Sequence, residues 1–188
     1  RPRALLEGRQ AFNAGRLSQQ ELDSLHNAAI LDTIQRFEAT GSPVITDGEQ
    51  SKPSFATYPI HGLGNLAPDG VTIPFADGHV RQLPRLTAGP FRYKTYAVEY
   101  LELAKRQAHV PVKQAVISAS ALSLLYPPGG IPGYTREAFV EDLLRENETD
   151  IRRCLQEGAH NVQIDFTEGR LAVKLDPTRQ LLKSFIDL

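Results

Sequence analysis

The stretch HNVQIDFTEGRLAVKLDP, residues 160–177, decides the fold predicted for this chain. It opens with a short apolar run, in which Val162 and Ile164 are separated by one polar residue, and the run ends at Asp165. This alternation predicts a buried strand, and the preceding Gly158 suits the end of a helix. A helix therefore leads into a strand that carries a carboxylate at its C-terminal end. Because ligands bind at that end of the strands in parallel α/β proteins, Asp165 is the first candidate for a site.

A similar order of elements occurs twice earlier in the chain. Residues 18–40 contain a capping box and a broad apolar stripe, which predict a long helix. Residues 43–46 then predict a short strand, followed closely by Glu49, and residues 111–117 predict another strand, followed by Ser118. Alternation of short strands with long helices predicts a parallel sheet. That sheet is either a small doubly wound sheet or part of a TIM barrel, which needs eight strands.

Further helices are predicted wherever apolar residues recur at helical spacing. They cover residues 2–14, 93–108 and 135–157, and a last helix begins at Thr178. The third of these helices also carries a run of acidic residues, which are expected to lie on the surface of the helix. The residues of this run are Glu146, Glu148 and Asp150.

Residues 51–90 interrupt the alternation, because they are rich in glycine and proline and lack helical periodicity. Within them, residues 71–75 and 79–83 flank the turn sequence Ala-Asp-Gly, which predicts a β-hairpin. We therefore expect a single domain over residues 1–188, with an inserted loop and hairpin at residues 51–90. In a barrel, a long excursion after the C-terminal end of a strand commonly covers the mouth of the active site.

Composition excludes several classes of partner. The 188 residues carry a net charge of −1, so no nucleic-acid partner is expected, and no apolar run is long enough for a membrane span. Cys154 is the single cysteine, which excludes an intrachain disulfide and favours a cytoplasmic protein. The chain begins at Arg1 without an initiator methionine and stops inside a predicted helix. Both features are typical of a segment of a longer protein, and a processed chain would share them.

Five phrases of the sequence form a further pattern: RPRALL (residues 1–6), AGRLS (14–18), VITDGE (44–49), YPPGGIPGYTR (126–136) and VQID (162–165). In this order, on alternating strands and helices, they resemble the catalytic domain of cobalamin-independent methionine synthase. The match is best to shorter single-domain relatives in the superfamily shared with uroporphyrinogen decarboxylase. The resemblance covers nearly the whole chain except the hairpin insertion. It implies a (β/α)8 TIM barrel, of which this chain forms roughly the first half.

The resemblance also implies an activity, namely a methyltransferase of methionine biosynthesis. Such an enzyme moves a methyl group from a folate-type donor to the zinc-bound thiol of homocysteine. In the family, a Glu after an early strand and an Asp after a later strand hold the amino group of the substrate, and these positions correspond to Glu49 and Asp165. Charge-assisted hydrogen bonds from an ammonium group suit such carboxylates. Ser118 and Glu168 are further substrate-binding candidates, and the expected partner is a small-molecule amino-acid thiol.

Two departures from the family concern the cofactors. The zinc ligands of the family, a His-x-Cys pair, a Glu and a further Cys, follow the strand that ends at Asp165, and this chain stops before them. Cys154 stands alone in a predicted helix, and the five histidines show no metal-ligand spacing. Zinc is therefore expected to bind outside this segment. Many relatives continue with Glu-Pro after the Asp, whereas residues 166–168 read Phe-Thr-Glu, so the sequence leaves the methyl donor open.

Two other functions stay open at this point. One is a metal-free lyase or decarboxylase of the same superfamily, in which arginines such as Arg81 or Arg170 would meet carboxylates of the substrate. The other is a non-catalytic half-barrel that pairs with a second chain or with itself as a homo-oligomer. An open half-barrel would leave strand edges and apolar faces exposed, which favours association.

Overall fold

The computed structural model describes residues 1–74, 78 and 80–188. The chain divides into two compact units. The first comprises Arg1–Phe55, Ala97–Ala115 and Arg152–Gln163, and the second comprises Ala56–Tyr96, Val116–Ile151 and Ile164–Leu188. Strands β5 (Gln114–Ile117) and β6 (Val162–Asp165) and helix α5 (Arg136–Gln156) each begin in one unit and end in the other. The predicted mixture of helices and strands is confirmed.

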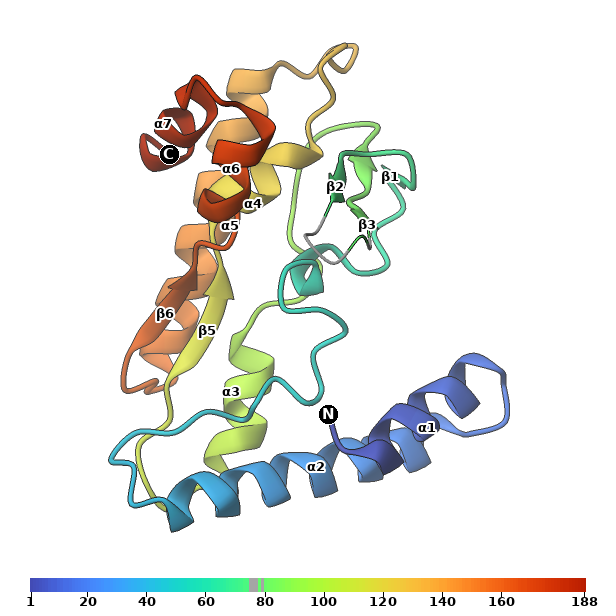
Figure 1. Cartoon of the computed structure of the whole chain (residues 1–188). Helices are drawn as coiled ribbons and strands as arrows, with labels where there is room; N and C mark the ends of the chain where they lie inside the picture. Colours follow the sequence, from blue (N-terminus) through green and yellow to red (C-terminus); the bar gives the residue numbers. More distant parts are fainter. Residues whose placement is uncertain (75–77, 79) are drawn as a thin grey trace. The chain divides into compact units, whose positions relative to one another are not determined.

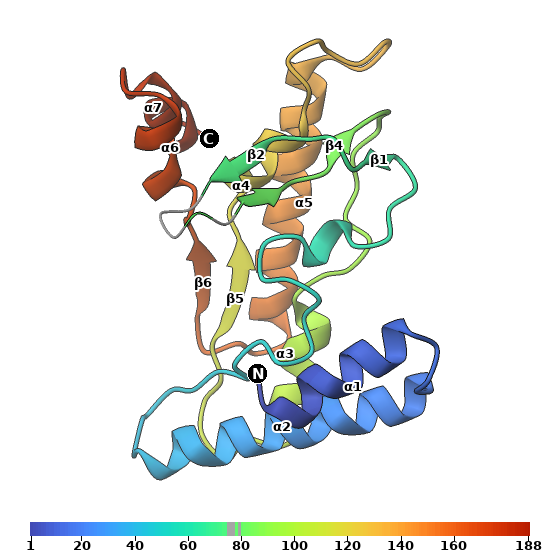
Figure 2. The same cartoon turned by 45° about the vertical axis from the view of Figure 1, so that its right-hand side comes forward.

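Helices α1 (Arg3–Asn13) and α2 (Gln19–Ala39) belong to the first unit and lie side by side (Figures 1 and 2). The predicted capping box begins α2. The Ser18 hydroxyl accepts a hydrogen bond from the Glu21 backbone N–H at 3.3 Å, and the Glu21 carboxylate accepts one from the Ser18 backbone N–H at 2.8 Å. These two bonds satisfy amide groups that a helix otherwise leaves unpaired at its start.

The contact between α1 and α2 forms a small apolar core. Leu5, Leu22 and Ala29 are buried there, and Phe12, Leu17 and Leu25 pack against them partly buried. Gly8 allows this approach, because a Cβ atom at that position would lie only 2.2 Å from Leu25 Cδ1. This core buries part of the apolar stripe of each helix, and the stripe of α2 continues through the buried Ile30 and Ile34 beyond it.

The strand predicted at residues 43–46 is reduced to one parallel bridge between Ile45 and Val112. The Ile45 N–H donates to the Pro111 carbonyl at 3.0 Å, and the Ile45 carbonyl accepts from Lys113 N–H at 2.9 Å. A longer strand does not form here for two reasons. Pro43 has no N–H to donate, and a turn begins directly after Thr46.

Strands β5 and β6 pair with each other and run in the same direction (Figures 1 and 2). Beyond the end of β5, the Ser118 N–H still donates to the Asp165 carbonyl at 3.2 Å. The bounds predicted for β6 are confirmed, but the prediction that it is a buried strand is wrong. Ile164 is 54% exposed and Gln163 is exposed as well, so the alternating pattern does not place an apolar side chain inward at Ile164.

The insertion belongs to the second unit after its first five residues. It contains the 3₁₀ helix η1 (Tyr58–Ile60) and two antiparallel pairs, β1 (Leu66–Ala67) with β4 (Arg85–Leu86) and β2 (Thr72–Pro74) with β3 (Val80–Gln82). The β2–β3 pair confirms the predicted hairpin. The hairpin residues Phe75, Ala76, Asp77 and His79 lie outside the described residues.

The remaining helices are short. They are α3 (Val98–Lys105), α4 (Ala119–Leu122), the 3₁₀ helix η2 (Ser123–Leu125), α6 (Gly169–Leu175) and α7 (Gln180–Ile186). The sequence did not predict α6. Helix α7 begins two residues later than expected, because the Asp176 carboxylate accepts hydrogen bonds from the Thr178 and Leu181 N–H groups and holds a turn there. Within the described part of the chain, no helix combines the length and hydropathy needed to cross a membrane.

Helix α5 buries three acidic side chains, Asp142, Glu146 and Asp150, which we call the α5 acidic row. The prediction that Glu146 and Asp150 lie on the surface is therefore wrong, whereas Glu148 is exposed as expected. The row is buried because segment 91–96 and Tyr58 supply it with hydrogen-bond donors, as a buried carboxylate requires.

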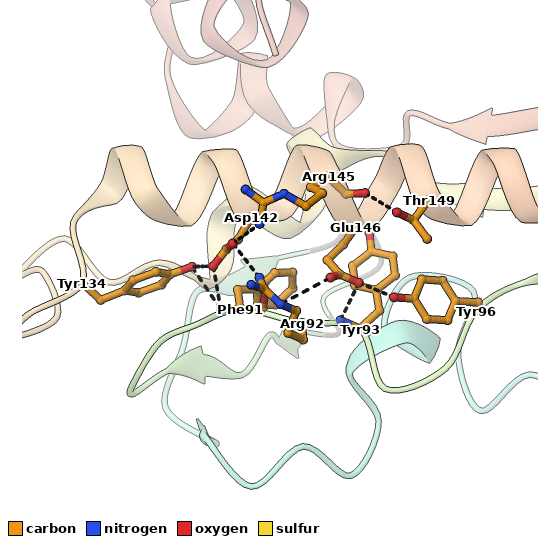
Figure 3. Close-up of polar contacts among 9 residues, drawn as sticks. All are labelled: Phe91, Arg92, Tyr93, Tyr96, Tyr134, Asp142, Arg145, Glu146 and Thr149. Atoms are coloured by element: carbon orange, nitrogen blue, oxygen red, sulfur yellow. Dashed lines mark hydrogen bonds and ion pairs between the residues drawn. The ribbon is translucent and has the colours of Figure 1, made fainter.

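The contacts of the α5 acidic row hold the two ends of the insertion, and Figure 3 shows the contacts with the segment that follows its C-terminal end. Asp142 Oδ2 accepts from the Phe91 N–H at 3.2 Å, and Glu146 Oε2 accepts from the Tyr93 N–H at 3.1 Å. At the other end of the insertion, the Tyr58 hydroxyl donates to Asp150. These bonds also explain why the helix predicted from residue 93 begins only at Val98, since the Tyr93 amide points to α5.

Asp142 accepts hydrogen bonds from Phe91, Tyr134 and Arg145 and forms an ion pair with Arg92. Burial favours its neutral form, but hydrogen bonds from Arg92 and Tyr134 and the charge of Arg92 outweigh burial, so its pKa is lowered. A carboxyl group whose pKa is lowered by folding stabilises the folded state at any pH above its pKa in the unfolded chain, about 4. This stabilisation is lost as the pH falls through the pKa of the group in the folded state.

We expect Asp142→Asn to lower the free energy of unfolding by about 2 kcal/mol at pH 7, because bonds to a charged acceptor are lost. The deficit should shrink as the pH falls below about 4, where Asp142 of the unfolded chain becomes protonated, and vanish once the pH passes through the lower pKa of folded Asp142. Urea unfolding between pH 3 and pH 8 measures this, with Glu141→Gln on the exposed side of α5 as the control. A deficit that does not change with pH would contradict the assignment.

For the helix cap, we expect Ser18→Ala to lower the free energy of unfolding by about 1 kcal/mol, because the Glu21 N–H in the first turn of α2 loses its acceptor, the Ser18 hydroxyl. Thermal unfolding measures the change. Ser24→Ala is the matched control, since Ser24 lies in the same helix and its hydroxyl bonds only to the Gln20 carbonyl one turn earlier. Equal effects of the two substitutions would show that the cap contributes nothing.

Candidate functional site

Ser118 follows the last residue of β5 and begins α4. Its hydroxyl oxygen accepts a hydrogen bond from the Ala121 N–H at 3.3 Å, as an N-terminal cap does, and the same hydroxyl donates to Glu168 Oε1 at 2.6 Å. Both hydrogen-bonding roles of the hydroxyl are thus used, and the side chain is held in one orientation. The end of β5 is fixed as well, because Asn147 of α5 donates from Nδ2 to the Ile117 carbonyl at 2.7 Å.

Glu168 lies just before α6 and is only 2% exposed. Its Oε1 accepts hydrogen bonds from the hydroxyls of Ser118 and Ser120, and both serines are also buried. Its Oε2 is buried too, but it has no hydrogen-bond partner within residues 1–74, 78 and 80–188. A buried carboxylate oxygen without a donor is costly, so this atom is suited to accept an N–H or O–H from a bound ligand.

Asp165 lies at the end of β6, next to these residues. Its carbonyl is bonded to the Ser118 N–H, and its side chain is partly buried. The structure therefore brings together three of the predicted site residues, Ser118, Asp165 and Glu168, with Ser120, which also follows the strand predicted at residues 111–117. We call these four residues the strand-end cluster. All of them belong to the second unit.

Glu49, the fourth predicted residue, belongs to the first unit. Its backbone is in the left-handed region, with φ of 55°, and its N–H donates to Asp47 Oδ1 at 2.8 Å. Its carboxylate forms an ion pair with Lys52, in which Nζ lies 2.8 Å from Oε1. The loop thus presents Glu49 in a fixed, uncommon backbone conformation, which is a feature of functional loops.

Asp47 is the other acidic residue of this loop, and it is buried. Burial raises its pKa, and the neighbouring charge of Glu49 adds to this, while the Glu49 N–H and the charge of Lys52 act in the opposite direction. Its Oδ1 closes the turn through the Glu49 N–H. We therefore assign Asp47 to holding the turn.

Sequence reasoning missed Lys52, which is fully buried despite its charge. The available signal was the spacing of Glu49 and Lys52, three residues apart and opposite in charge, but such pairs are common on surfaces. Two arginines named for the lyase alternative, Arg81 on β3 and Arg170 on α6, are exposed.

The residues do not fit a zinc site. Within the described part of the chain, no group of three or more His, Cys, Asp and Glu side chains is placed to hold a metal ion. Cys154 is buried in α5, where it packs as a small apolar side chain. Zinc in catalytic sites takes three protein ligands, so we derive no step of chemistry through zinc from these residues.

No protein-family model matches this sequence. No curated protein matches it either. Solved structures do match. A putative vitamin B12-independent methionine synthase from Listeria monocytogenes aligns over 100% of this chain and 57% of its own, with a TM-score of 0.68 and 21% identity. A B12-independent methionine synthase from Shewanella sp. W3-18-1, in complex with selenomethionine, aligns over 85% of this chain and 47% of its own, with a TM-score of 0.66 and 19% identity.

The chain has the fold of B12-independent methionine synthases. It spans about half the length of the two structures it matches. The resemblance seen in the five sequence phrases is thereby confirmed at the level of the fold. The low identity means that the methionine synthase activity of those proteins does not follow from the likeness alone.

Proposed function

We propose that this chain forms part of a methyltransferase of the B12-independent methionine synthase type, which acts on the thiol of a small amino acid. The observation that carries the proposal is the strand-end cluster at the carboxyl ends of two parallel strands, in which the buried Oε2 of Glu168 has no partner among the residues that the structure describes. That edge is where parallel α/β folds bind their ligands. The methionine synthase fold and the selenomethionine bound to the Shewanella protein support an amino acid as the ligand class.

In this proposal, the chain's own residues bind and orient the substrate. The ammonium group of the amino acid donates to Glu168 Oε2, while Ser118 and Ser120 hold Oε1 in place. Asp165, at the end of β6 in the same unit, takes the ammonium-binding role that the resemblance implies for it. Charge-assisted hydrogen bonds of this kind fix the orientation of a ligand as well as adding affinity. Orienting the reacting thiol is itself a large contribution to rate.

The cofactors in this proposal are those that the family resemblance implies. Zinc would lower the pKa of the substrate thiol, and a folate-type molecule would supply the methyl group. Because the described residues do not fit a zinc site, we propose that other residues provide the metal ligands. We also propose that the chain forms roughly the first half of a TIM barrel, with the insertion at residues 51–90 on the ligand-binding side.

A second candidate is a half-barrel that pairs with another copy of the chain. It is favoured by the apolar side chains exposed on and after β6, since Ile164 is 54% and Phe166 41% exposed. Sedimentation of the chain between micromolar and hundred-micromolar concentration decides this candidate. A monomer over the whole range removes it.

The test of the main proposal is calorimetric titration of the chain with L-methionine. We expect Glu168→Gln to weaken binding at least tenfold, because an amide nitrogen or neutral oxygen replaces the charged acceptor for the ammonium group, and one ionic hydrogen bond is worth about 1.5–3 kcal/mol. Glu148→Gln, an exposed residue of the same unit, is the control and should bind as the wild type does. Binding by wild type that Glu168→Gln leaves intact would refute the site.

A further inference from the structure

Phe166 is an apolar residue that stays partly exposed at the carboxyl end of β6. It directly follows Asp165, the last residue of the strand, and it is 41% exposed. Single exposed apolar residues are common on proteins, so exposure alone indicates no role. What distinguishes Phe166 is its position, because the buried carboxylate of Glu168 follows only two residues later in the same unit.

The ring of Phe166 lies against Gly169, the first residue of α6. A Cβ atom at position 169 would lie 2.9 Å from Phe166 Cδ1, 3.1 Å from Cζ and closer still to Cε1. Glycine is therefore required at this position for the ring to pack on the backbone. One side of the ring is fixed by this packing, and the exposed remainder forms an apolar surface at the residue next to Glu168.

Glu168 supplies the polar half of this arrangement. Its Oε1 accepts hydrogen bonds from Ser118 and Ser120, and its buried Oε2 has no partner among the described residues. An amino acid carries its ammonium group and its side chain on the same carbon atom. When the ammonium group donates to Oε2, an apolar side chain therefore needs an apolar neighbour close to Glu168. The Phe166 ring, packed on the adjacent residue, is suited to be that neighbour.

We infer that Phe166 is a specificity-determining residue, whose ring contacts the thioether side chain of the amino-acid substrate, and that Gly169 holds the ring in place. A thioether sulfur makes favourable contacts with an aromatic ring. The inference rests on the proposed function, because it takes from it the amino acid as ligand and Glu168 as the ammonium acceptor. It adds selectivity for the side chain, which the ammonium contact cannot provide, since amino acids share that group.

The experiment compares two ligands in calorimetric titrations of the full chain: L-methionine and L-alanine, which lacks the thioether. We expect wild type to bind L-methionine at least tenfold more tightly, because its side chain is longer by three apolar heavy atoms. Phe166→Ala should reduce this preference at least fivefold and leave the affinity for L-alanine within twofold of wild type.

Gly169→Ala is the second variant, and it should have the same effect as Phe166→Ala. It keeps the ring but displaces it, while alanine itself is well tolerated within a helix. Ile186→Ala is the matched control, because Ile186 is an apolar residue of the same unit, 67% exposed in α7. This control should keep the preference of wild type for L-methionine.

The outcomes separate this inference from the proposed function. Glu168→Gln should weaken both ligands, and if it weakens neither, the proposed site fails and the inference falls with it. The same holds if wild type binds neither ligand. If Glu168→Gln weakens both ligands but Phe166→Ala keeps the preference, only this inference fails. It also fails if Phe166→Ala weakens both ligands equally, because the role of the ring is then merely structural.

Sedimentation of the same variants separates a ligand contact from the pairing of two copies, since an exposed ring could serve either. We expect Phe166→Ala to sediment as wild type does between micromolar and hundred-micromolar concentration. If Phe166→Ala instead abolishes an association of wild type and leaves the preference for L-methionine unchanged, the ring belongs to an interface between copies and the inference is refuted.

Discussion

A buried carboxylate must be given hydrogen-bond donors, and this constraint organises the second unit. Along α5, the donors for the acidic row come from the chain itself, through backbone N–H groups at Phe91 and Tyr93 and the hydroxyl of Tyr58. The insertion is therefore tied down at both ends, close to where it leaves and rejoins the strands and helices. At Glu168, donors from the described part of the chain reach one carboxylate oxygen and leave the other without a partner. That difference separates carboxylates that hold the fold from one that is suited to a ligand.

The first unit meets the same constraint with an internal cation. Lys52 compensates Glu49, and two arginines hold the carbonyl of that lysine. In both units, then, a buried carboxylate has one oxygen bound by the protein and the other without a partner among the described residues, Asp47 Oδ2 in the first unit and Glu168 Oε2 in the second. Such half-satisfied acceptors are rare in folded proteins, and they favour sites where a ligand completes the hydrogen bonding.

Local features of the sequence predicted most of the longer helices and the strand at 162–165, but not how the strands join into sheets. The capping box at Ser18, the helix after Thr135 and the strand at 162–165 each depend on neighbouring residues, and each was found within a residue or two. The burial of Glu146 was missed because its donors come from Tyr93 and Tyr96, about fifty residues earlier. Ser118, Asp165 and Glu168 of the strand-end cluster were also named as binding candidates from the sequence. No local pattern could show that Glu168 Oε2 lacks a partner among the described residues, because this depends on packing between separate segments.

The central claim is that Glu168 Oε2 accepts a hydrogen bond from the amino group of an amino acid. A crystal structure of the chain with L-methionine tests it most directly. The account predicts the ligand nitrogen within about 2.7–3.2 Å of Oε2, with the serine hydroxyls still bound to Oε1. A structure in which L-methionine binds elsewhere, while Oε2 is paired with a donor from the chain itself, would contradict the account.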